Sequence, residues 1–226
     1  MNNILSRSNT TKEVLSRIRT DIILRVFKNG EPIRELALSE QYGVSRSAVR
    51  NALLVLEQES LIRTLDNGTK VVSCIEPEDI QNLYDLREHI ELTSIKQLFS
   101  LPNKDFTPIM EVTSRIASSP GLDVTEILEI DAQFHRSIIV CCRNKALLQA
   151  WETMIGVMQS IFHLNMTQSR EYEEWFLQSF YDRHTRLFTT LLGPPEESIR
   201  QFAQHIEDAR EISAKAIAQV LKSSKQ

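Results

Sequence analysis

The stretch Gly43-Val44-Ser45-Arg46-Ser47-Ala48-Val49-Arg50-Asn51-Ala52-Leu53 decides the fold expected for the first part of this chain. Its glycine can turn the chain, and Ser45 can cap the helix that follows. Arg46 and Arg50 share one face of that helix. An apolar stripe lies beside them and contains Val49, Leu53 and Leu56. One packed side and one side with basic donors is what the recognition helix of a helix-turn-helix requires. An amphipathic surface helix with two solvated arginines is the alternative.

Three helices and a hairpin are expected in residues 1–74. The helices are predicted at about 10–28, 35–42 and 45–59. Helical spacing in the first two of these helices predicts six core residues: Val14, Ile18, Ile22, Val26, Leu36 and Leu38. Two β-rich runs then flank Asn67-Gly68, which is a strong hairpin signal. Together these elements predict a winged helix-turn-helix. Its wing would place three residues at a phosphate or minor-groove edge of the DNA: Asn67, Gly68 and Lys70. The alternative is that Asn-Gly occurs there only because the hairpin turn requires it.

The charge of the 226-residue chain is unevenly distributed. Residues 1–73 carry 11 Lys and Arg against 8 Asp and Glu, or +3; the remainder carries 15 against 22, or −7, and the total is −4. The acidic total argues against a general polyanion binder, whereas the basic first part suits a DNA-reading head. No apolar run reaches the ~20 residues of a membrane span. The start lacks a signal-peptide core, and three cysteines make no disulfide framework, so a cytoplasmic location without membrane contact is expected.

Residues 75–226 are predicted to form an antiparallel all-α bundle, which would bind an effector and dimerise. Its helices are expected at about 77–100, 104–118, 123–142, 145–166, 171–192 and 196–222. The apolar stripe assigned to the first of them consists of Ile80, Leu83, Leu86 and Ile90. The chain as a whole is therefore predicted to be mainly α.

Four polar residues border the apolar stripes of three bundle helices: Asp131, His135, His184 and His205. Asp131 and His135 stand at i and i+4, and the spacing predicts that all four face one interior. Three imidazoles and one carboxylate suit a divalent metal, with zinc favoured over nickel or manganese. An external carboxylate can take a remaining coordination position. A metal-free hydrogen-bonded core is the alternative. Two other histidines, His89 and His163, are expected to be rim or structural residues.

Arg87 follows the apolar stripe of the bundle's first helix. It can pair with Glu91 at i+4, or it can face the cavity and bind an anionic effector. A metalloenzyme is a rival function for the bundle. It is disfavoured because no His-Glu-x-x-His occurs and because Phe134, rather than a glutamate, precedes His135. We therefore expect a regulator and not an enzyme.

These residues resemble a known family. Gly43 to Leu53, with Leu61-Ile62 and Asn67-Gly68, is similar to the DNA-binding domain of GntR-family bacterial transcription regulators. The bundle resembles the FCD effector domain of the FadR subfamily, through the matching pieces Asp85-Leu86-Arg87 with Glu91, Asp131-Ala132-Gln133-Phe134-His135, Asn144, His184 and His205. Departures from the family pattern are Ala48 for a favoured proline, Asn51 for glutamate, and Leu36 where relatives are often basic.

The resemblance implies a homodimeric regulator, with a repressor favoured, that binds a palindromic operator in double-stranded DNA. It implies that Arg46 and Arg50 read bases. It also implies that the Asp/His set binds a metal that helps to hold a small organic-acid effector. Ser45 and Ser47 are expected to contact phosphates or base edges. Whether the effector releases or promotes DNA binding stays open.

Overall fold

The computed structural model describes residues 2–117, 121–168 and 170–223, with side chains described from residue 11 onward except those of 167 and 168. It divides into two compact units. The first runs up to Glu76 and includes the chain from Ile217 onward, and the second is Pro77–Ala216. The division thus falls two residues after the boundary at 74/75 drawn from the sequence, and the end of the last helix joins the first unit.

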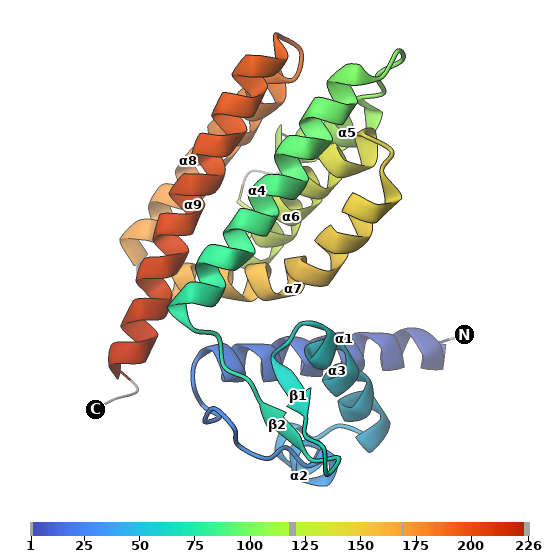
Figure 1. The fold of residues 1–226 in the computed structure, drawn as a ribbon, viewed down its shortest axis with the longest axis vertical. Helices are drawn as coiled ribbons and strands as arrows, with labels where there is room; N and C mark the ends of the chain where they lie inside the picture. Colours follow the sequence, from blue (N-terminus) through green and yellow to red (C-terminus); the bar gives the residue numbers. More distant parts are fainter. Residues whose placement is uncertain (1, 118–120, 169, 224–226) are drawn as a thin grey trace. The chain divides into compact units, whose positions relative to one another are not determined.

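The first unit has the elements of a winged helix-turn-helix (Figure 1). Its elements are α1 (Asn2–Ile23), α2 (Glu35–Tyr42), α3 (Arg46–Gln58), β1 (Ile62–Thr64) and β2 (Lys70–Val72). The two strands pair antiparallel, with Ile62 opposite Val72 and Thr64 opposite Lys70. The predicted fold of this part is confirmed. A feature not predicted is that Pro32 bridges Val71, so an extended segment before α2 lies along β2.

The core of the first unit lies between α1 and α3, and it corrects two of the predicted core positions. The buried residues include Val14, Ile18, Ile22, Leu38, Val49, Leu53 and Leu56. Val26 is exposed because α1 ends at Ile23 and Arg25 takes φ of 61°, which turns the chain off the helix axis. Leu36 is exposed because the short helix α2 presents Leu38 and Tyr42 to the core instead.

The turn between α2 and α3 is built as the sequence predicts. Gly43 lies in the left-handed region at φ 65°, and its N–H donates to the carbonyl of Ser39. Ser45 is the N-cap of α3, and its Oγ accepts from the backbone N–H of Ala48 at 3.2 Å. At the other end of α3, Arg19 of α1 donates through Nε and Nη2 to both carboxylate oxygens of the C-cap residue Glu59. The turn and the N-cap thus fix the start of α3, and the ion pair ties its end to α1.

Gly43→Ala is expected to lower the free energy of unfolding by about 1–2 kcal/mol, because an L residue with a Cβ is strained in the left-handed region. No atom lies within 4 Å of the position of the added Cβ, so no steric clash adds to the backbone strain. Thermal unfolding measures it. Gly193→Ala is the control, because its φ is outside the left-handed region and its Cβ meets Thr190 O at an ordinary 3.5 Å. Equal melting temperatures for the two variants would contradict the prediction.

Among its described residues the second unit consists of helices and the turns that connect them, without a strand (Figure 1). It holds α4 (Pro77–Ser100), α5 (Thr107–Ala117), α6 (Val124–Cys141), α7 (Lys145–Gln168) and α8 (Arg170–Thr190), and most of α9 (Pro195–Ser223). Helix α6 packs against α4, α5, α7 and α8, and is therefore the central element. The predicted all-α bundle is confirmed, and the helix boundaries agree within a few residues. Residue 118, at the expected end of α5, lies outside the described residues.

One predicted core position in the bundle is wrong. Leu86 is exposed, whereas Tyr84, Arg87 and Glu91 on the same helix are buried. A polar pair thus occupies part of the buried face of α4, which displaces the apolar stripe expected from spacing alone. Among the helices that the structure describes, none is long and apolar enough to cross a membrane.

Candidate functional site

The recognition helix α3 presents its two arginines to solvent. The side chains of Arg46 and Arg50 are 61% and 60% exposed, whereas Val49 and Leu53 on the opposite side are buried. The N-cap residue Ser45 directs its Oγ toward the helix and also toward Ser47 Oγ at 3.0 Å. The helix thus has the packed side and the donor side that the sequence predicts.

Glu35, which was not singled out from the sequence, binds Arg50 and lies near Arg46. Glu35, the first residue of α2, accepts from Arg50 Nε at 2.9 Å and from Arg50 Nη2 at 2.8 Å, and lies 3.9 Å from Arg46. The hydrogen bond from Arg50 lowers the pKa of Glu35. This side-on pairing uses one edge of the guanidinium and leaves the end-on pair of N–H groups for a base edge. Its only sequence signal is an acidic residue in the first turn of α2.

The wing residues serve the turn and the packing of the wing. Gly68 has φ of 81°, and Asn67 Oδ1 accepts from the N–H of Thr69 at 3.0 Å. Lys70 Nζ donates to Glu57 on α3 and to Thr64 on β1. The Asn67 side chain and the Lys70 ammonium therefore have partners within the unit. DNA contact by the wing stays a prediction.

The four predicted metal ligands come together within the second unit. Asp131 and His135 extend from α6, His184 from α8 and His205 from α9. His135 and His184 are fully buried, Asp131 is nearly so, and His205 is half-buried. Ligand nitrogens of the three histidines all lie within 4.8 Å of one another. We call Asp131, His135, His184 and His205 the histidine cluster.

Hydrogen bonds on the far side of two imidazoles orient the rings of the histidine cluster. His135 Nδ1 lies 2.6 Å from Glu91 Oε2, and His184 Nδ1 lies 2.9 Å from the carbonyl oxygen of Phe180. Both oxygens are acceptors, so each Nδ1 donates its proton to one of them, and in the neutral ring Nε2 then presents a lone pair to the cluster. Burial lowers the pKa of His184, which keeps that ring neutral.

The inward-facing atoms are acceptors that face one another. His184 Nε2 lies 2.9 Å from Asp131 Oδ1 but has no hydrogen-bond partner, and His135 Nε2 lies 3.2 Å from His205 Nε2. Two atoms bonded to one zinc ion at about 2.0–2.1 Å lie about 3.4 Å apart in a tetrahedral arrangement. The donor set and its spacing therefore fit a divalent metal, and a cation there would satisfy the buried Nε2 of His184.

Neighbouring groups keep the carboxylate of the histidine cluster ionised. Burial alone would raise the pKa of Asp131, but the close approach of His184 at 2.9 Å, together with His135 and the Arg87 guanidinium, lowers it overall. The pKa of His205 is held well below its usual value by burial and by the other two histidines. An ionised Asp131 and neutral rings at His184 and His205 are the protonation states that metal ligation needs of these three residues.

Arg87 forms the ion pair with Glu91 that was the first of its two predicted alternatives. Its Nε donates to Glu91 Oε1 at 2.6 Å, and its guanidinium carbon lies 5.9 Å from the ring centroid of Tyr84 and 5.7 Å from that of Phe162. Glu91 thus joins Arg87 to His135. The contact of Glu91 with His135 was missed from the sequence, because the two residues lie on different helices. Effector binding by Arg87 stays a prediction.

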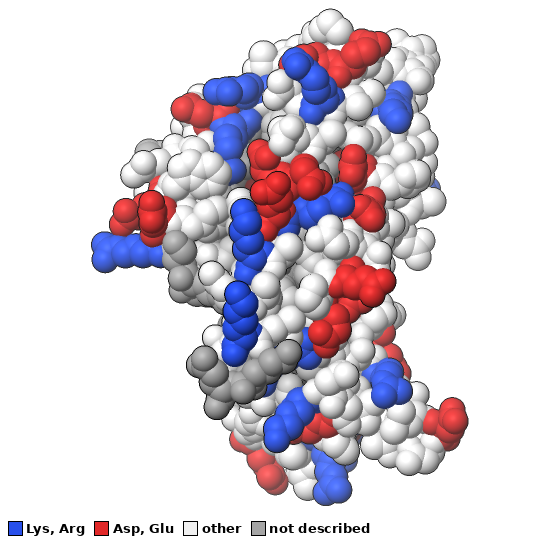
Figure 2. All heavy atoms as spheres, turned by 60° about the vertical axis from the view of Figure 1, so that its left-hand side comes forward, with Lys and Arg blue, Asp and Glu red and all other residues white. Residues whose placement is uncertain are grey.

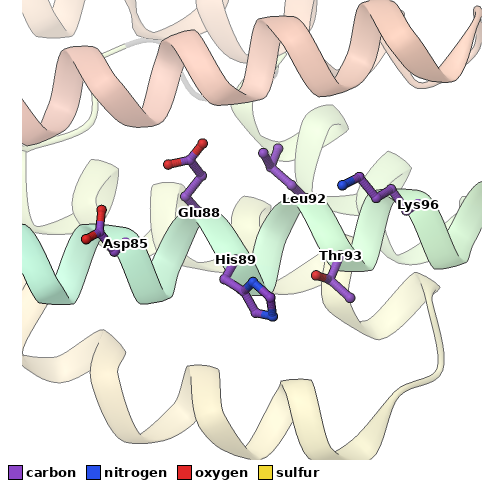
Figure 3. Close-up of a pocket in the computed structure, with 6 residues that line it drawn as sticks. All are labelled: Asp85, Glu88, His89, Leu92, Thr93 and Lys96. Atoms are coloured by element: carbon purple, nitrogen blue, oxygen red, sulfur yellow. The ribbon is translucent and has the colours of Figure 1, made fainter.

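A second feature is a shallow hollow of about 280 Å³ along α4, lined by Asp85, Glu88, His89, Leu92, Thr93 and Lys96. Figure 3 shows Glu88 and Leu92 pointing to one side of α4 and His89 and Thr93 to the other. Arg210 donates to Asp85 at 2.7 Å and to Glu88 at 3.2 Å. None of the lining residues belongs to the histidine cluster, so this hollow is a separate surface feature, and His89 lies there as a rim residue.

Basic and acidic side chains lie side by side over the face of the molecule in Figure 2. This face therefore offers no broad positive field of the kind that attracts DNA from a distance.

A recognition helix with exposed arginines, joined to a helical unit with a metal-type histidine cluster, defines a DNA-binding regulator with a separate sensing domain. Comparison with known families agrees. The bacterial regulatory proteins of the gntR family match residues 10–72, and the FCD domain matches residues 82–209. The chain belongs to the GntR family of bacterial transcriptional regulators, and its FCD domain fits the FadR subfamily. It is accordingly not an enzyme.

Individual relatives are distant but cover most of the chain. An uncharacterized HTH-type transcriptional regulator, YdhC of Bacillus subtilis, is 23% identical over 189 residues, and the matched region covers 82% of each of the two chains. The gluconate operon transcriptional repressor of Bacillus licheniformis is 28% identical, over 80% of this chain and 74% of the repressor. A GntR transcriptional regulator from Rhodococcus sp. RHA1 has the same fold, with a TM-score of 0.59, 22% identity and coverage of 94% and 97%.

Proposed function

We propose that this protein is a homodimeric repressor whose histidine cluster binds one divalent metal and, through it, a small carboxylate effector. The observation that carries the proposal is the pair of oriented histidines, His135 and His184, whose Nε2 lone pairs meet Asp131 and His205. Two of the similar proteins are transcriptional repressors of gluconate operons, which supports repression. We expect the protein to work in the cytoplasm, because that is where a bacterial operator lies.

In this proposal each residue has a defined task. Asp131, His135, His184 and His205 would hold the metal, with zinc favoured over nickel or manganese. When bound, the metal supplies a positive centre that coordinates a carboxylate oxygen. Glu91 fixes the tautomer and orientation of His135, and Phe134 packs edge-on against His135 and His184 with centroid distances of 5.4 and 4.9 Å. The chain thereby keeps the ligand rings in place and shields them from water.

On the DNA side, a dimer would present two copies of α3 to a two-fold operator. Arg46 and Arg50 would donate to guanine O6 and N7 in the major groove, while Ser45 and Ser47 would contact phosphates or base edges. An effector changes DNA affinity only if it binds one arrangement of the two recognition helices better than another. Release and promotion of DNA binding are both compatible with this requirement.

Protein purified without an affinity tag or chelator is expected to contain about one equivalent of a transition metal per chain, because a complete three-histidine, one-carboxylate site binds zinc tightly. His135→Ala is expected to lose this metal. Elemental analysis of both proteins provides the measurement. His163→Ala is the matched control, because it removes an exposed histidine outside the cluster and should keep the metal.

Absence of metal from the wild type, even after zinc, nickel or manganese is added at neutral pH, would contradict the metal site. The four residues would then be a hydrogen-bonded core, and the assignment of the DNA-binding domain would be unaffected.

A further inference from the structure

Arg183 has a buried guanidinium edge without an acceptor. It precedes His184 on α8, and its Nε and Nη2 have no hydrogen-bond partner although neither is exposed to solvent. The guanidinium carbon lies 4.6 Å from the ring centroid of Trp175 and 4.7 Å from that of Phe176. The aromatic faces stabilise the cation but accept no hydrogen bond in the plane of the guanidinium. Leaving charged donors buried and unsatisfied is costly, so this edge calls for an acceptor.

The same guanidinium edge is occupied in other arginines of this chain. Arg19 donates through Nε and Nη2 to Glu59, and Arg50 donates through Nε and Nη2 to Glu35. In both cases two parallel N–H groups bind the two oxygens of one carboxylate, which is a strong and geometrically specific interaction. The open edge of Arg183 is therefore complementary to a carboxylate that none of the described residues supplies.

A row of rings on α8 connects this edge with the histidine cluster. Phe176, Phe180 and His184 follow at i, i+4 and i+8, with ring centroids 5.6 Å and 4.2 Å apart. Asp131 of the cluster also interacts electrostatically with Arg183 and opposes the lowering of its pKa by burial. Residues eight apart on a helix are separated by about 12 Å along its axis. The rings at the two ends of the row, those of Phe176 and His184, are no farther apart than the two centroid distances together, because their side chains lean along the helix. One carboxylate is too short to contact both ends of such a row, whereas the two ends of a dicarboxylate can contact both.

We propose that Arg183 binds one carboxylate of a dicarboxylate effector whose other carboxylate is bound at the histidine cluster. The inference rests on the proposed function of the cluster as a metal and effector site. It assigns the role of anion clamp to Arg183, whose Nε–Nη2 edge is open, whereas the Nε of Arg87 is occupied by Glu91. Trp175 and Phe176 hold the guanidinium plane in position, so that the edge is preorganised for the ligand.

The test compares matched acids on metal-loaded full-length protein. Succinate, glutarate and adipate are titrated beside butyrate, pentanoate and hexanoate, which have the same carbon chains with one carboxylate fewer. Dissociation constants are obtained from thermal shifts as a function of acid concentration. The variants are Arg183→Met, which keeps much of the side-chain length, and Arg186→Met, which removes an exposed arginine from the same helix. Metal content is measured for every protein.

We expect at least one dicarboxylate to stabilise the wild type more than its monocarboxylate partner. Arg183→Met should raise the dissociation constant for that dicarboxylate about 10- to 100-fold, the loss expected for hydrogen bonds to a charged group. It should leave the monocarboxylate and the metal content unchanged, and Arg186→Met should behave as the wild type. Without ligand, Arg183→Met should fold at least as stably as the wild type, because it removes a desolvated charge.

The proposal is overturned if no dicarboxylate stabilises the wild type, if each monocarboxylate binds as tightly as its partner, or if Arg183→Met binds the dicarboxylate normally. Failure of the proposed function has a different signature, because the wild type would then contain no metal. If the wild type contains metal but is stabilised by none of the dicarboxylates, only the role of Arg183 is refuted, and the metal site is not.

Discussion

Glu91→Ala is expected to lower the stability of the protein by about 3–5 kcal/mol, because removing one partner of a buried ion pair leaves the other charge uncompensated. Arg87 would lose the acceptor at 2.6 Å from its Nε while remaining fully buried. The same substitution removes the oxygen at 2.6 Å from His135 Nδ1, and loss of a carboxylate behind a ligand histidine weakens metal binding about 10- to 100-fold. Thermal unfolding measures the first effect, and competition with a metal-binding dye measures the second.

A double variant separates these two effects. Arg87→Met with Glu91→Leu removes both charges and fills the space with apolar atoms, which for buried pairs is often neutral or stabilising. It should therefore restore most of the lost stability. Metal affinity should stay low, because His135 still lacks its acceptor. If Glu91→Ala melts at the temperature of the wild type, the buried contacts of Glu91 with Arg87 and His135 do not stabilise the protein. If metal affinity recovers in the double variant, Glu91 does not orient His135.

Arg50→Ala is expected to lower discrimination between the operator and a wrong base about 5- to 150-fold, which is the contribution of one bidentate arginine–guanine contact. The reason is that α3 presents Arg50 on its exposed side with the end-on pair of N–H groups unused. Binding of the operator and of single-base variants is measured at several salt concentrations. An unchanged order of preference among the variants would refute base reading by Arg50.

Two variants at the same surface serve as controls for this prediction. Lys70→Ala should weaken all DNA sequences about equally and reduce the salt slope by about 1, as expected for a phosphate contact. Unchanged DNA binding by Lys70→Ala would mean that this lysine contacts no phosphate and only pairs with Glu57 and Thr64. Glu35→Ala should reduce discrimination, because it releases Arg50, while it strengthens binding to unrelated DNA, because it removes a negative charge.

Much of the fold could be predicted because the signals for it are local. The apolar stripe of α3, the left-handed turn at Gly43 and the Asn67-Gly68 hairpin each involve residues that are close in sequence. The positions that were wrong are also local in origin. Val26 and Leu36 lie at a helix end and in a short helix, where spacing alone does not show which side is buried. Leu86 is exposed because α4 buries an ion pair, which apolar periodicity does not register.

Which residues meet in the histidine cluster was also accessible from the sequence, because their positions on the helices predict which faces they share. Asp131 and His135 lie on one face of α6 by spacing, and His184 and His205 lie within apolar stripes of α8 and α9. Helical periodicity brings such residues to an interior whatever the detailed packing. The sequence by itself therefore determined the two kinds of domain, the recognition helix and the members of the histidine cluster.

Only the tertiary structure decided which charged groups pair. Glu91 contacts His135 across 44 positions of sequence, Glu35 contacts Arg50 across 15, and Arg183 keeps an open edge. No periodicity predicts these outcomes, since each depends on where two side chains from different helices end, to within the roughly 0.3 Å that separates a good hydrogen bond from a poor one. The packing of the helices sets those distances, and with them which donors are satisfied within the protein and which are left for a ligand.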